Sequence, residues 1–456
     1  MENTLSLGEL RAAVSDGKID TVLVCMTDMQ GRLIGKFYGA LPFLASCEKG
    51  FQCIDYLLAN DMNMELVPGY EASGLEKGYG DFTLKPDFTT LRRVPWLEKS
   101  CLVLCDCVDP RTGEELAHSP RTMLKNQIGK LKEMNLNPLA ATELEFYLFD
   151  STPEELAAAG YRNLKTVGHA MQDYHILQGS KIEPLMRDIR EKMNAAGIPV
   201  ENSTLEWGPG QTEVNIRYGD ALTVADNHTI LKYGIKLIAA AHGKTASFIA
   251  KWNNDFAGSS SHVHLSLENT KDSTPAFFDP ADPYGMSDLM KNFLAGQIKH
   301  AADYTWFLAP FVNSYKRFRR GSLAPTNISW SVDNRTAGFR VCAPNDKSVR
   351  FECRIGGSDL NPYLALAAIL AAGTAGLKNK EPLPPEFKGD AYAARKITSV
   401  PATLNEARQA MLNSDFLKKA FSEKVIKHYA RNAEWESEQF NNAITDWEIT
   451  RYLEQS

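Results

Sequence analysis

Acidic, imidazole and guanidinium side chains recur at every second residue in four short stretches of the sequence. The stretches are ATELEFYLF, QTEVNIRY, SHVHLSL and VRFECRI, which begin at residues 141, 211, 261 and 349. Because alternate side chains of a β-strand point to the same face, each stretch would have one polar and one apolar face. The polar faces carry Glu143, Glu145, Glu213, His262, His264, Arg350, Glu352 and Arg354.

Two interpretations of these polar faces are open. An antiparallel sheet with one face in water alternates in the same way. A wet face is usually filled with Lys, Thr, Ser and mixed charges, however, and these faces contain no Lys. Carboxylates with an imidazole suit Mg²⁺ or Mn²⁺, and arginines bind carboxylate and phosphate groups bidentately. The second interpretation is therefore metal-assisted phosphoryl transfer or a related anion chemistry, and spacing alone does not decide between the two.

The segments around these strands predict an α+β fold with a mostly antiparallel sheet and helices outside it. Apolar residues at helical spacing and helix-stop signals predict the helices, and no short βαβ unit or Gly-rich turn of a doubly wound sheet is present. The predicted helices begin after Ser119, cover 184–196, 222–241, 289–304 and 360–376, and continue from Thr403 onward.

The first hundred residues differ from the rest. Residues 21–37 alternate like a hairpin, 48–95 are predicted to be loops with short strands, and CLVLCDCV closes the region as a strand. A domain boundary is expected near 110–120. Cys101, Cys105 and Cys107 would share one face of that strand, but no CxxC or His partner accompanies them. A set of core thiols is a better interpretation than a metal site.

Bulk properties exclude several classes of function. The chain has 456 residues, 44% of them hydrophobic and 23% charged, so it can bury a sizeable core. The net charge of -6 argues against nucleic-acid binding. No apolar run is long enough to span a bilayer, and the N-terminal residues lack the apolar region of a signal peptide. We therefore expect a cytoplasmic protein with neither nucleic acid nor membrane as partner.

Six motifs in order resemble those of the glutamine synthetase family. The resemblance covers about residues 115–450 and, more weakly, the N-terminal part. The motifs are TELEFYLFD, LEWGPGQTE, GSSSHVHLSL, NSYKRF, DNRTAGFRV and VRFECRIGGSDLNPYLALAA. The resemblance implies a small β-grasp-like domain at 1–112 and a catalytic domain at 113–456. It also implies Mg²⁺ or Mn²⁺ as cofactors and ATP as co-substrate.

The resemblance further implies a role for each matching residue. One metal would be held by Glu145, Glu206 and Glu213, and the other by Glu143, His262 and Glu352. The nucleotide residues would be His264, Ser266, Arg340 and Arg350, and the glutamate residues Gly258, Arg317 and Arg354. Arg335 would meet the transferring phosphoryl group. In the implied reaction the glutamate γ-carboxylate attacks ATP, and an amine then displaces phosphate from γ-glutamyl phosphate.

The sequence departs from the ammonia-using members at two points. Leu323 stands where their flap carries a glutamate that binds ammonium, and a leucine can neither hold a cation nor accept its proton. The N-terminal acid that reaches the neighbouring site is matched only loosely, by Asp61 or its rival Asp55. Leu323 offers apolar surface, and Arg319 and Arg320 beside it disfavour a polycationic substrate.

These departures resemble the γ-glutamyl-amine branch of the family and predict a small alkyl or aryl amine as substrate. One alternative is a true glutamine synthetase, in which Leu323 only packs and ammonia enters through Asp61 and Glu206. A catalytically silent relative with a regulatory binding role is another alternative, but all six implied metal ligands are present. The family also implies a homo-oligomeric ring, expected to be a double hexamer with active sites between subunits.

Overall fold

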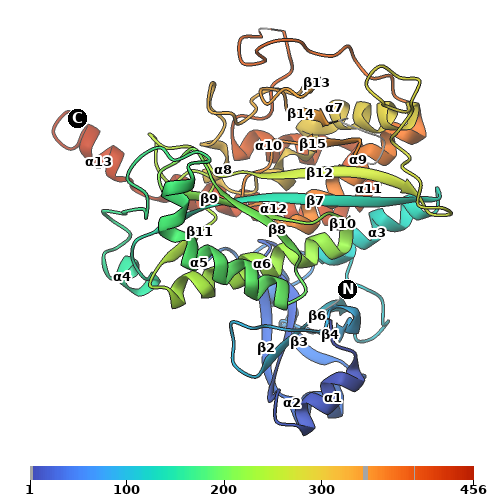
Figure 1. Ribbon diagram of the computed structural model, residues 1–456, viewed down its shortest axis with the longest axis vertical. Helices are drawn as coiled ribbons and strands as arrows, with labels where there is room; N and C mark the ends of the chain where they lie inside the picture. Colours follow the sequence, from blue (N-terminus) through green and yellow to red (C-terminus); the bar gives the residue numbers. More distant parts are fainter. Residues whose placement is uncertain (1–3, 343–347, 395) are drawn as a thin grey trace.

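The computed structural model describes residues 4–342, 348–394 and 396–456, which fold around two β-sheets (Figure 1). The smaller sheet comes from the N-terminal part and has the order β2-β1-β6-β4-β3, with β5 beside β6. Its strands are β1 (Thr21–Thr27), β2 (Leu33–Gly39), β3 (Phe51–Ile54), β4 (Asp81–Pro86), β5 (Arg92–Arg93) and β6 (Ser100–Val108). The pair β1–β6 is parallel and the other pairs are antiparallel.

The larger sheet has the order β13-β14-β15-β12-β7-β9-β8, with β10 and β11 also paired to β7. Only the pair β13–β14 is parallel among the described strands of this sheet. The strands are β7 (Leu136–Phe149), β8 (Val200–Leu205), β9 (Gln211–Ile216), β10 (Gly219–Asp220), β11 (Thr245–Ser247), β12 (Ser261–Asn269), β13 (Trp330–Val332), β14 (Phe339–Cys342) and β15 (Arg350–Cys353). The predicted α+β class with a mostly antiparallel sheet is confirmed.

Helices flank both sheets (Figure 1). Helix α9 lies at the centre of the helical layer and packs against α7 and α3. A Cβ on Gly296 of α7 would lie 2.2 Å from a carbonyl oxygen of α9, so glycine is what allows this close helix crossing. The α-helices are α1 (Leu7–Ser15), α2 (Ala40–Ser46), α3 (Pro120–Lys132), α4 (Pro153–Ala158), α5 (Ile176–Ala195), α6 (Ala221–Ala241), α7 (Asp288–Leu308), α8 (Val312–Tyr315), α9 (Pro362–Asn379), α10 (Leu404–Asn413), α11 (Asp415–Phe421), α12 (Glu423–Asn442) and α13 (Asp446–Tyr452).

The smaller sheet is covered on both faces. On one face, side chains such as Val22 and Val24 join α1 and α2 in a separate core, and on the other Leu23 and Leu102 join the main core. Because both faces of the sheet are buried, the sequence of β1 is a nearly continuous run of apolar residues. The separate core also contains the β6 cysteines. Cys101, Cys105 and Cys107 are buried there as free thiols, which confirms them as core residues of one strand face.

One helix boundary was predicted incorrectly. Helix α5 begins at Ile176, well before the predicted start at Pro184, and contains that proline in its interior. Its first turn carries Ile176 and Leu177 exposed to solvent, so the apolar periodicity that marks a packed helix is absent there. Within the part of the chain that the structure describes, no helix has the length and apolar character needed to cross a membrane.

Candidate active site

The strand pairing of the larger sheet aligns the predicted polar residues with one another. His262 of β12 lies opposite Glu143 of β7, and His264 lies opposite Glu352 of β15. Arg340 of β14 also lies opposite Glu352. Because directly opposed residues share one face of a sheet, the register alone brings these side chains into a single layer.

The burial of this layer rules out an ordinary wet face. Glu145, Glu213 and His262 are each 7% exposed, and Glu352 is 0% exposed. Buried charges of this kind are stable only when they are paired or when they bind ions. The interpretation of these faces as solvent-exposed surface is therefore wrong.

Four of these residues form one hydrogen-bonded group, here called the paired cluster: Glu143, His262, His264 and Glu352. His262 Nδ1 lies 2.9 Å from Glu143 Oε2 and 3.2 Å from Glu352 Oε1. His264 Nε2 lies 2.9 Å from Glu143 Oε1, while its Nδ1 accepts a hydrogen bond from Arg350 Nε at 3.1 Å. The acceptor role of Nδ1 places the proton of a neutral His264 on Nε2, where it points to Glu143.

Two arginines complete the charge balance of the paired cluster. Arg340 Nη1 donates to Glu352 Oε2 at 3.1 Å, and Arg354 donates to Glu352 Oε1. Burial alone would raise the pKa of Glu352, but the positive charges of His262 and Arg354 hold that pKa below its ordinary value. The pKa of Glu143 is likewise lowered, despite burial, by its hydrogen bonds to His262 and His264.

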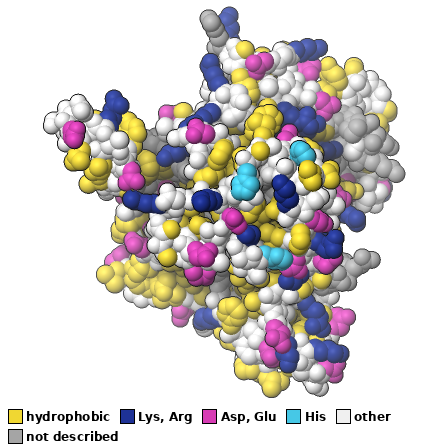
Figure 2. Space-filling model, turned by 60° about the vertical axis from the view of Figure 1, so that its left-hand side comes forward, with side chains coloured by type: hydrophobic (Ala, Val, Ile, Leu, Met, Phe, Trp, Pro, Cys, Tyr) yellow, Lys and Arg dark blue, Asp and Glu magenta, His cyan; other side chains and the backbone are white. Residues whose placement is uncertain are grey.

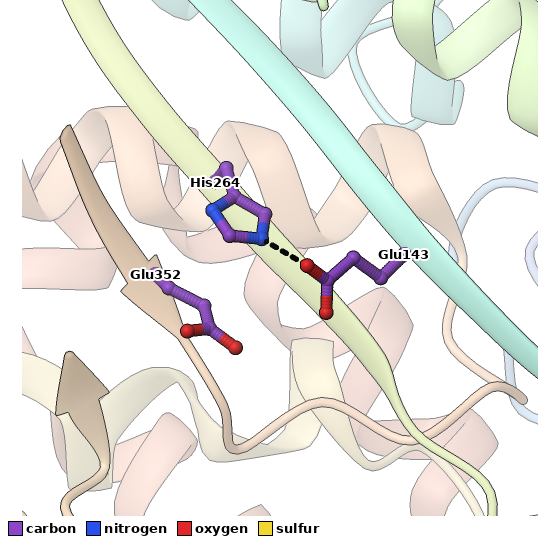
Figure 3. Close-up of side chains that lie close together, drawn as sticks. All are labelled: Glu143, His264 and Glu352. Carbon is purple, nitrogen blue, oxygen red and sulfur yellow. Dashed lines mark hydrogen bonds and ion pairs between the residues drawn. The ribbon is translucent and has the colours of Figure 1, made fainter. Parts of the chain in front are cut away.

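The carboxylates of Glu143 and Glu352 face a common space with the His264 ring, as Figure 3 shows. One ligand atom from each of these three residues lies within 4.8 Å of the other two, close enough for one metal ion to bridge them. Carboxylate oxygens with one imidazole nitrogen suit Mg²⁺ or Mn²⁺. The predicted ligand His262 is not one of these three residues, although its Nδ1 also contacts both carboxylates.

A second group, here called the acidic cluster, consists of Glu145, Glu206 and Glu213. Glu145 lies opposite Glu213 in the pairing of β7 with β9, and Glu206 follows the end of β8. Burial and the charges of Glu145 and Glu213 raise the pKa of Glu206 to about 9. Burial and neighbouring carboxylates also raise the pKa of Glu213 to about 8. The cluster is short of positive charge, which is the condition under which carboxylates bind a cation.

Neutral donors hold the acidic cluster in place. The backbone N–H of Ser260 donates to Glu145 Oε2 at 2.8 Å, and the Ser260 hydroxyl donates to Glu145 Oε1. Asn215 Nδ2 donates to Glu213 Oε1 at 2.8 Å. These bonds fix the direction of the carboxylates without cancelling their charge.

A cavity of about 650 Å³ opens beside the paired cluster and is lined by Glu143, His264, Ser266 and Arg350. Three of the four residues predicted to bind nucleotide therefore meet in one cavity, and the fourth, Arg340, lies on the paired cluster. Tyr218 also lines this cavity, with an exposed ring, and sequence reasoning missed it. Strand β9 ends at residue 216, so the alternation used to choose candidates no longer applies at residue 218.

The residues predicted to bind glutamate lie close together. A Cβ on Gly258 would lie 2.8 Å from Arg317 Cγ, so only glycine leaves room for the stem of this arginine. Arg317 is buried and donates to the carbonyl oxygens of Ile355 at 2.9 Å and of Arg354 at 3.2 Å. Arg354 Nε donates to the carbonyl oxygen of Arg335 at 3.3 Å, while the Arg335 side chain is exposed.

Leu323 and Asp61 are placed differently from the clusters. Leu323 is 50% exposed and has a φ of 55°, an unusual backbone conformation for leucine. Asp61 is buried, and its carboxylate accepts hydrogen bonds from the backbone N–H groups of Asn63 and Glu65 and from Trp435 Nε1 of α12. Within one chain, the structure does not bring Asp61 to the acidic or the paired cluster.

Comparisons with known proteins agree with this arrangement. The family model described as the catalytic domain of glutamine synthetase matches residues 117–452. The chain belongs to the glutamine synthetase family. Within this family it is 42% identical to gamma-glutamylethanolamide synthetase from Streptomyces coelicolor over 99% of this chain and 96% of that protein. It is 38% identical to a glutamate–isopropylamine ligase from a Pseudomonas species over 99% of both chains.

A solved structure confirms the fold of this glutamine synthetase family member. The structure, described as a GmaS/ADP complex, superposes with a TM-score of 0.85 and 24% sequence identity, covering 97% of this chain and 99% of that one. The resemblance predicted from the six motifs is thus confirmed, and so is the fold class. The implied domain boundary and the roles of individual residues stay predictions.

Proposed function

We propose that this protein is an ATP-dependent ligase that joins the γ-carboxylate of glutamate to an amine through γ-glutamyl phosphate. The observation that carries the proposal is the paired cluster, which lies between a nucleotide-sized cavity and a second, acidic cluster. The names of the two relatives support it, because each describes a ligase or synthetase that couples a glutamyl group to an amine larger than ammonia.

The two clusters would hold the cations that the reaction needs. Carboxylate and imidazole groups form the donor set, which fits Mg²⁺ or Mn²⁺. When bound, these ions neutralise charge on the phosphates and on the phosphoryl group in transfer. The proposed ligands are Glu143, His262 and Glu352 for one ion and Glu145, Glu206 and Glu213 for the other.

The nucleotide lies in the 650 Å³ cavity in this proposal. Tyr218 offers an exposed ring on which a base can stack, and Ser266 and Arg350 line the same cavity. Arg340 stabilises the phosphates from the edge of the paired cluster, and the exposed Arg335 meets the phosphoryl group as it is transferred.

The amine attacks the acyl phosphate from the side of the acidic cluster. Its nitrogen forms the new bond to the γ-carbon while the bond to the phosphate oxygen breaks, and Glu206 accepts the proton that the amine loses. Arg317 and Arg354 hold the glutamate, and Gly258 permits the close approach. Asp61 acts in the site of a neighbouring subunit, a role that requires an assembly because it stands apart from the clusters of its own chain.

The assembly that we propose is a ring of identical subunits, in the form of a double hexamer. Helix α13 supports it, because this helix stands away from the body at the end of the chain and none of its residues is buried (Figure 1). Its exposed side chains include Trp447 and Tyr452. Apolar surface of this kind on a projecting helix is typical of a contact with another subunit.

The proposal is tested by measuring phosphate release from ATP and glutamate with a panel of amines and with Mg²⁺ or Mn²⁺. Ethylamine, isopropylamine, ethanolamine, aniline, putrescine and ammonia form a suitable panel. We expect small alkyl or aryl amines to support turnover at lower concentrations than ammonia does. Turnover with ammonia alone would identify a glutamine synthetase, and absence of turnover with every amine would identify a silent relative. The Glu145→Ala variant, expected to be inactive, serves as the control.

Leu323 is proposed to contribute to the choice of amine. The Leu323→Glu substitution introduces the glutamate that the flap of ammonia-using family members carries at this position. We expect it to raise the rate with ammonia relative to the rate with isopropylamine. The comparison requires kcat/KM for both amines in both proteins. An unchanged ratio would remove Leu323 from the determinants of specificity.

A further inference from the structure

Arg317 is a buried cation whose charge the described part of the chain does not fully balance. On the face shown in Figure 2, Lys and Arg side chains reach the surface, where water balances their charge. Arg317 differs, because it is only 3% exposed and its guanidinium group donates to two carbonyl oxygens, which carry no net charge. Burial lowers the pKa of Arg317, and the nearby acids do not make up the difference. A guanidinium group in this condition favours the binding of an anion.

A tyrosine hydroxyl near this arginine is also unsatisfied. Tyr392 is 9% exposed, and within the described residues its hydroxyl has no hydrogen-bond partner. Burial raises the pKa of the Tyr392 phenol to about 12, although the charges of Arg354 and Arg317 oppose the rise. The hydroxyl therefore lies within electrostatic reach of both guanidinium groups. Buried hydroxyl groups are normally hydrogen-bonded, so this exception requires an explanation.

The segment that carries Tyr392 is attached to the candidate active site. The backbone N–H of the preceding residue, Ala391, donates to Thr336 Oγ1 at 3.0 Å. Thr336 follows Arg335, whose carbonyl oxygen accepts the hydrogen bond from Arg354 Nε at 3.3 Å. The same short turn thus holds both the segment of the tyrosine and one of the two arginines that are proposed to bind glutamate.

We propose that the Tyr392 hydroxyl donates a hydrogen bond to the α-carboxylate of glutamate, between Arg317 and Arg354, as a further residue of the glutamate site. This inference rests on the proposed ligase function and deepens it. The γ-carboxylate attacks ATP, which leaves the α-carboxylate for this contact. A carboxylate has about four lone-pair sites, so it can bind two guanidinium groups and a phenol together.

The bound carboxylate would satisfy both unmatched groups at once. It supplies the negative charge that the buried Arg317 needs, and it gives the Tyr392 hydroxyl an acceptor. Because the pKa of Tyr392 is raised, the phenol keeps its proton near neutral pH and remains a donor. A hydrogen bond to a charged group in a buried site is among the stronger ones in proteins.

The test compares the wild-type enzyme with Tyr392→Phe, which removes only the hydroxyl. We expect the KM for glutamate to rise by about tenfold or more, as for the loss of other hydrogen bonds to charged groups. The α-carboxylate does not react and is bound alike before and during the reaction, so kcat should change by no more than about twofold. The KM for ATP should also stay within about twofold of the wild-type value.

Thermal unfolding gives a second readout that needs no turnover. Without ligands, Tyr392→Phe should be at least as stable as the wild type, because the hydroxyl that it lacks is buried and has no partner among the described residues. Glutamate should raise the Tm of the wild type more than that of the variant. A lower Tm of the ligand-free variant, with the KM values for glutamate and ATP raised alike, would assign the hydroxyl a structural role and overturn the inference.

Tyr315→Phe is the matched control. Tyr315 is buried, and its hydroxyl likewise has no hydrogen-bond partner in the part of the chain that the structure describes. The charges that act on its phenol, however, are those of the acids Asp359 and Glu406. This variant should leave the KM for glutamate within about twofold of the wild-type value. A rise as large as that in Tyr392→Phe would show that the loss of any buried hydroxyl disturbs the site, and the inference would be wrong.

The outcomes separate this inference from the proposed function. If the wild-type enzyme couples glutamate to an amine but Tyr392→Phe changes neither the KM for glutamate nor the rise in Tm that glutamate causes, the ligase function stands and the inference is wrong. If the wild-type protein neither binds glutamate nor turns it over, the proposed function fails and the inference fails with it.

Discussion

The two clusters of the candidate site differ in how the chain treats buried negative charge. In the paired cluster each carboxylate meets an imidazole or a guanidinium group, and the pKa values of Glu143 and Glu352 are lowered. In the acidic cluster carboxylates meet one another, and the pKa values of Glu206 and Glu213 are raised. The fold therefore balances one half of the site by itself and leaves the other half dependent on an external cation.

The difference follows from which strands meet. Strands β12, β14 and β15 contribute histidines and arginines to the paired cluster, opposite an acid on β7. Strands β7, β8 and β9 meet at the other cluster and contribute the acids together with Asn215, which is neutral. One half of such a site is balanced in charge without an ion, and the other half reaches that balance only when it binds one.

The largest effect is expected from Glu352→Ala. The substitution leaves Arg340 and Arg354 without their buried counter-charge, and breaking a buried ion pair costs about 3–5 kcal/mol. Chemical denaturation should show a loss of that size, and turnover should fall by a factor on the order of a thousand or more. A variant of near wild-type stability would show that the two arginines do not depend on Glu352.

The opposite effect on stability is expected from Glu206→Gln. The metal-free folded protein keeps Glu206 protonated at neutral pH, whereas the unfolded chain gains free energy by ionising it. The amide removes that gain, so the metal-free protein should become more stable by about 1–3 kcal/mol. Turnover should nevertheless fall by about a hundredfold or more, because the variant lacks the acceptor of the amine proton. A loss of stability in the absence of metal would contradict the contrast between the clusters.

The two clusters should also respond to different ranges of pH. The folded-state pKa values of Glu206, about 9, and Glu213, about 8, lie above the ordinary value of 4.5, so the folded protein keeps protons that the unfolded chain has released. Stability of the metal-free protein should therefore fall as the pH rises from about 5 to about 9. The lowered pKa values of the paired cluster stabilise the fold above pH 4.5, and this contribution is lost only in acid.

Thermal unfolding in EDTA and in Mn²⁺, from about pH 5 to about pH 9, measures how stability depends on pH. Mn²⁺ should reduce the decline, because the ion replaces the protons of the acidic cluster. The double variant Glu206→Gln, Glu213→Gln isolates the contribution, since its stability in EDTA should depend less on pH than that of the wild type. Parallel curves for the two proteins would show that the acidic cluster does not titrate in this window.

Much of the paired cluster was predictable from sequence because alternation along a strand is a local property. A period of two placed Glu143, His262 and Glu352 on polar strand faces, and the family resemblance then implied that they act together. The charge contrast between the clusters was not predictable, because it depends on which strands are neighbours. That order, with β12 between β7 and β15, arises from contacts between residues far apart in the sequence.

Residues outside the strands were the least predictable. Tyr218 lies in the connection after β9, where no period relates one side chain to the next. Asp61 shows the reverse problem: it was predicted as the acid that reaches a neighbouring site, whereas its buried carboxylate accepts hydrogen bonds from backbone N–H groups and from Trp435. Composition and motif spacing carry no information about such local hydrogen bonding.

The smallest effect is expected from Asn215→Ala, which tests how the acidic cluster is held. Asn215 donates the hydrogen bond that lowers the pKa of Glu213 against burial and the nearby carboxylates. Removing a hydrogen bond to a charged group costs about 1.5–3 kcal/mol, part of which returns when water replaces the amide at this half-buried position. Glu213 should then hold its proton more strongly, so apparent Mn²⁺ affinity at pH 7 should fall by a few-fold and recover at pH 9. Titration calorimetry at both pH values measures the apparent Mn²⁺ affinity.

An equal loss of affinity at the two pH values would show that Asn215 orients the Glu213 carboxylate without altering its protonation. The geometry of the carboxylates, and not competition between protons and the metal ion, would then determine how the acidic cluster binds a cation.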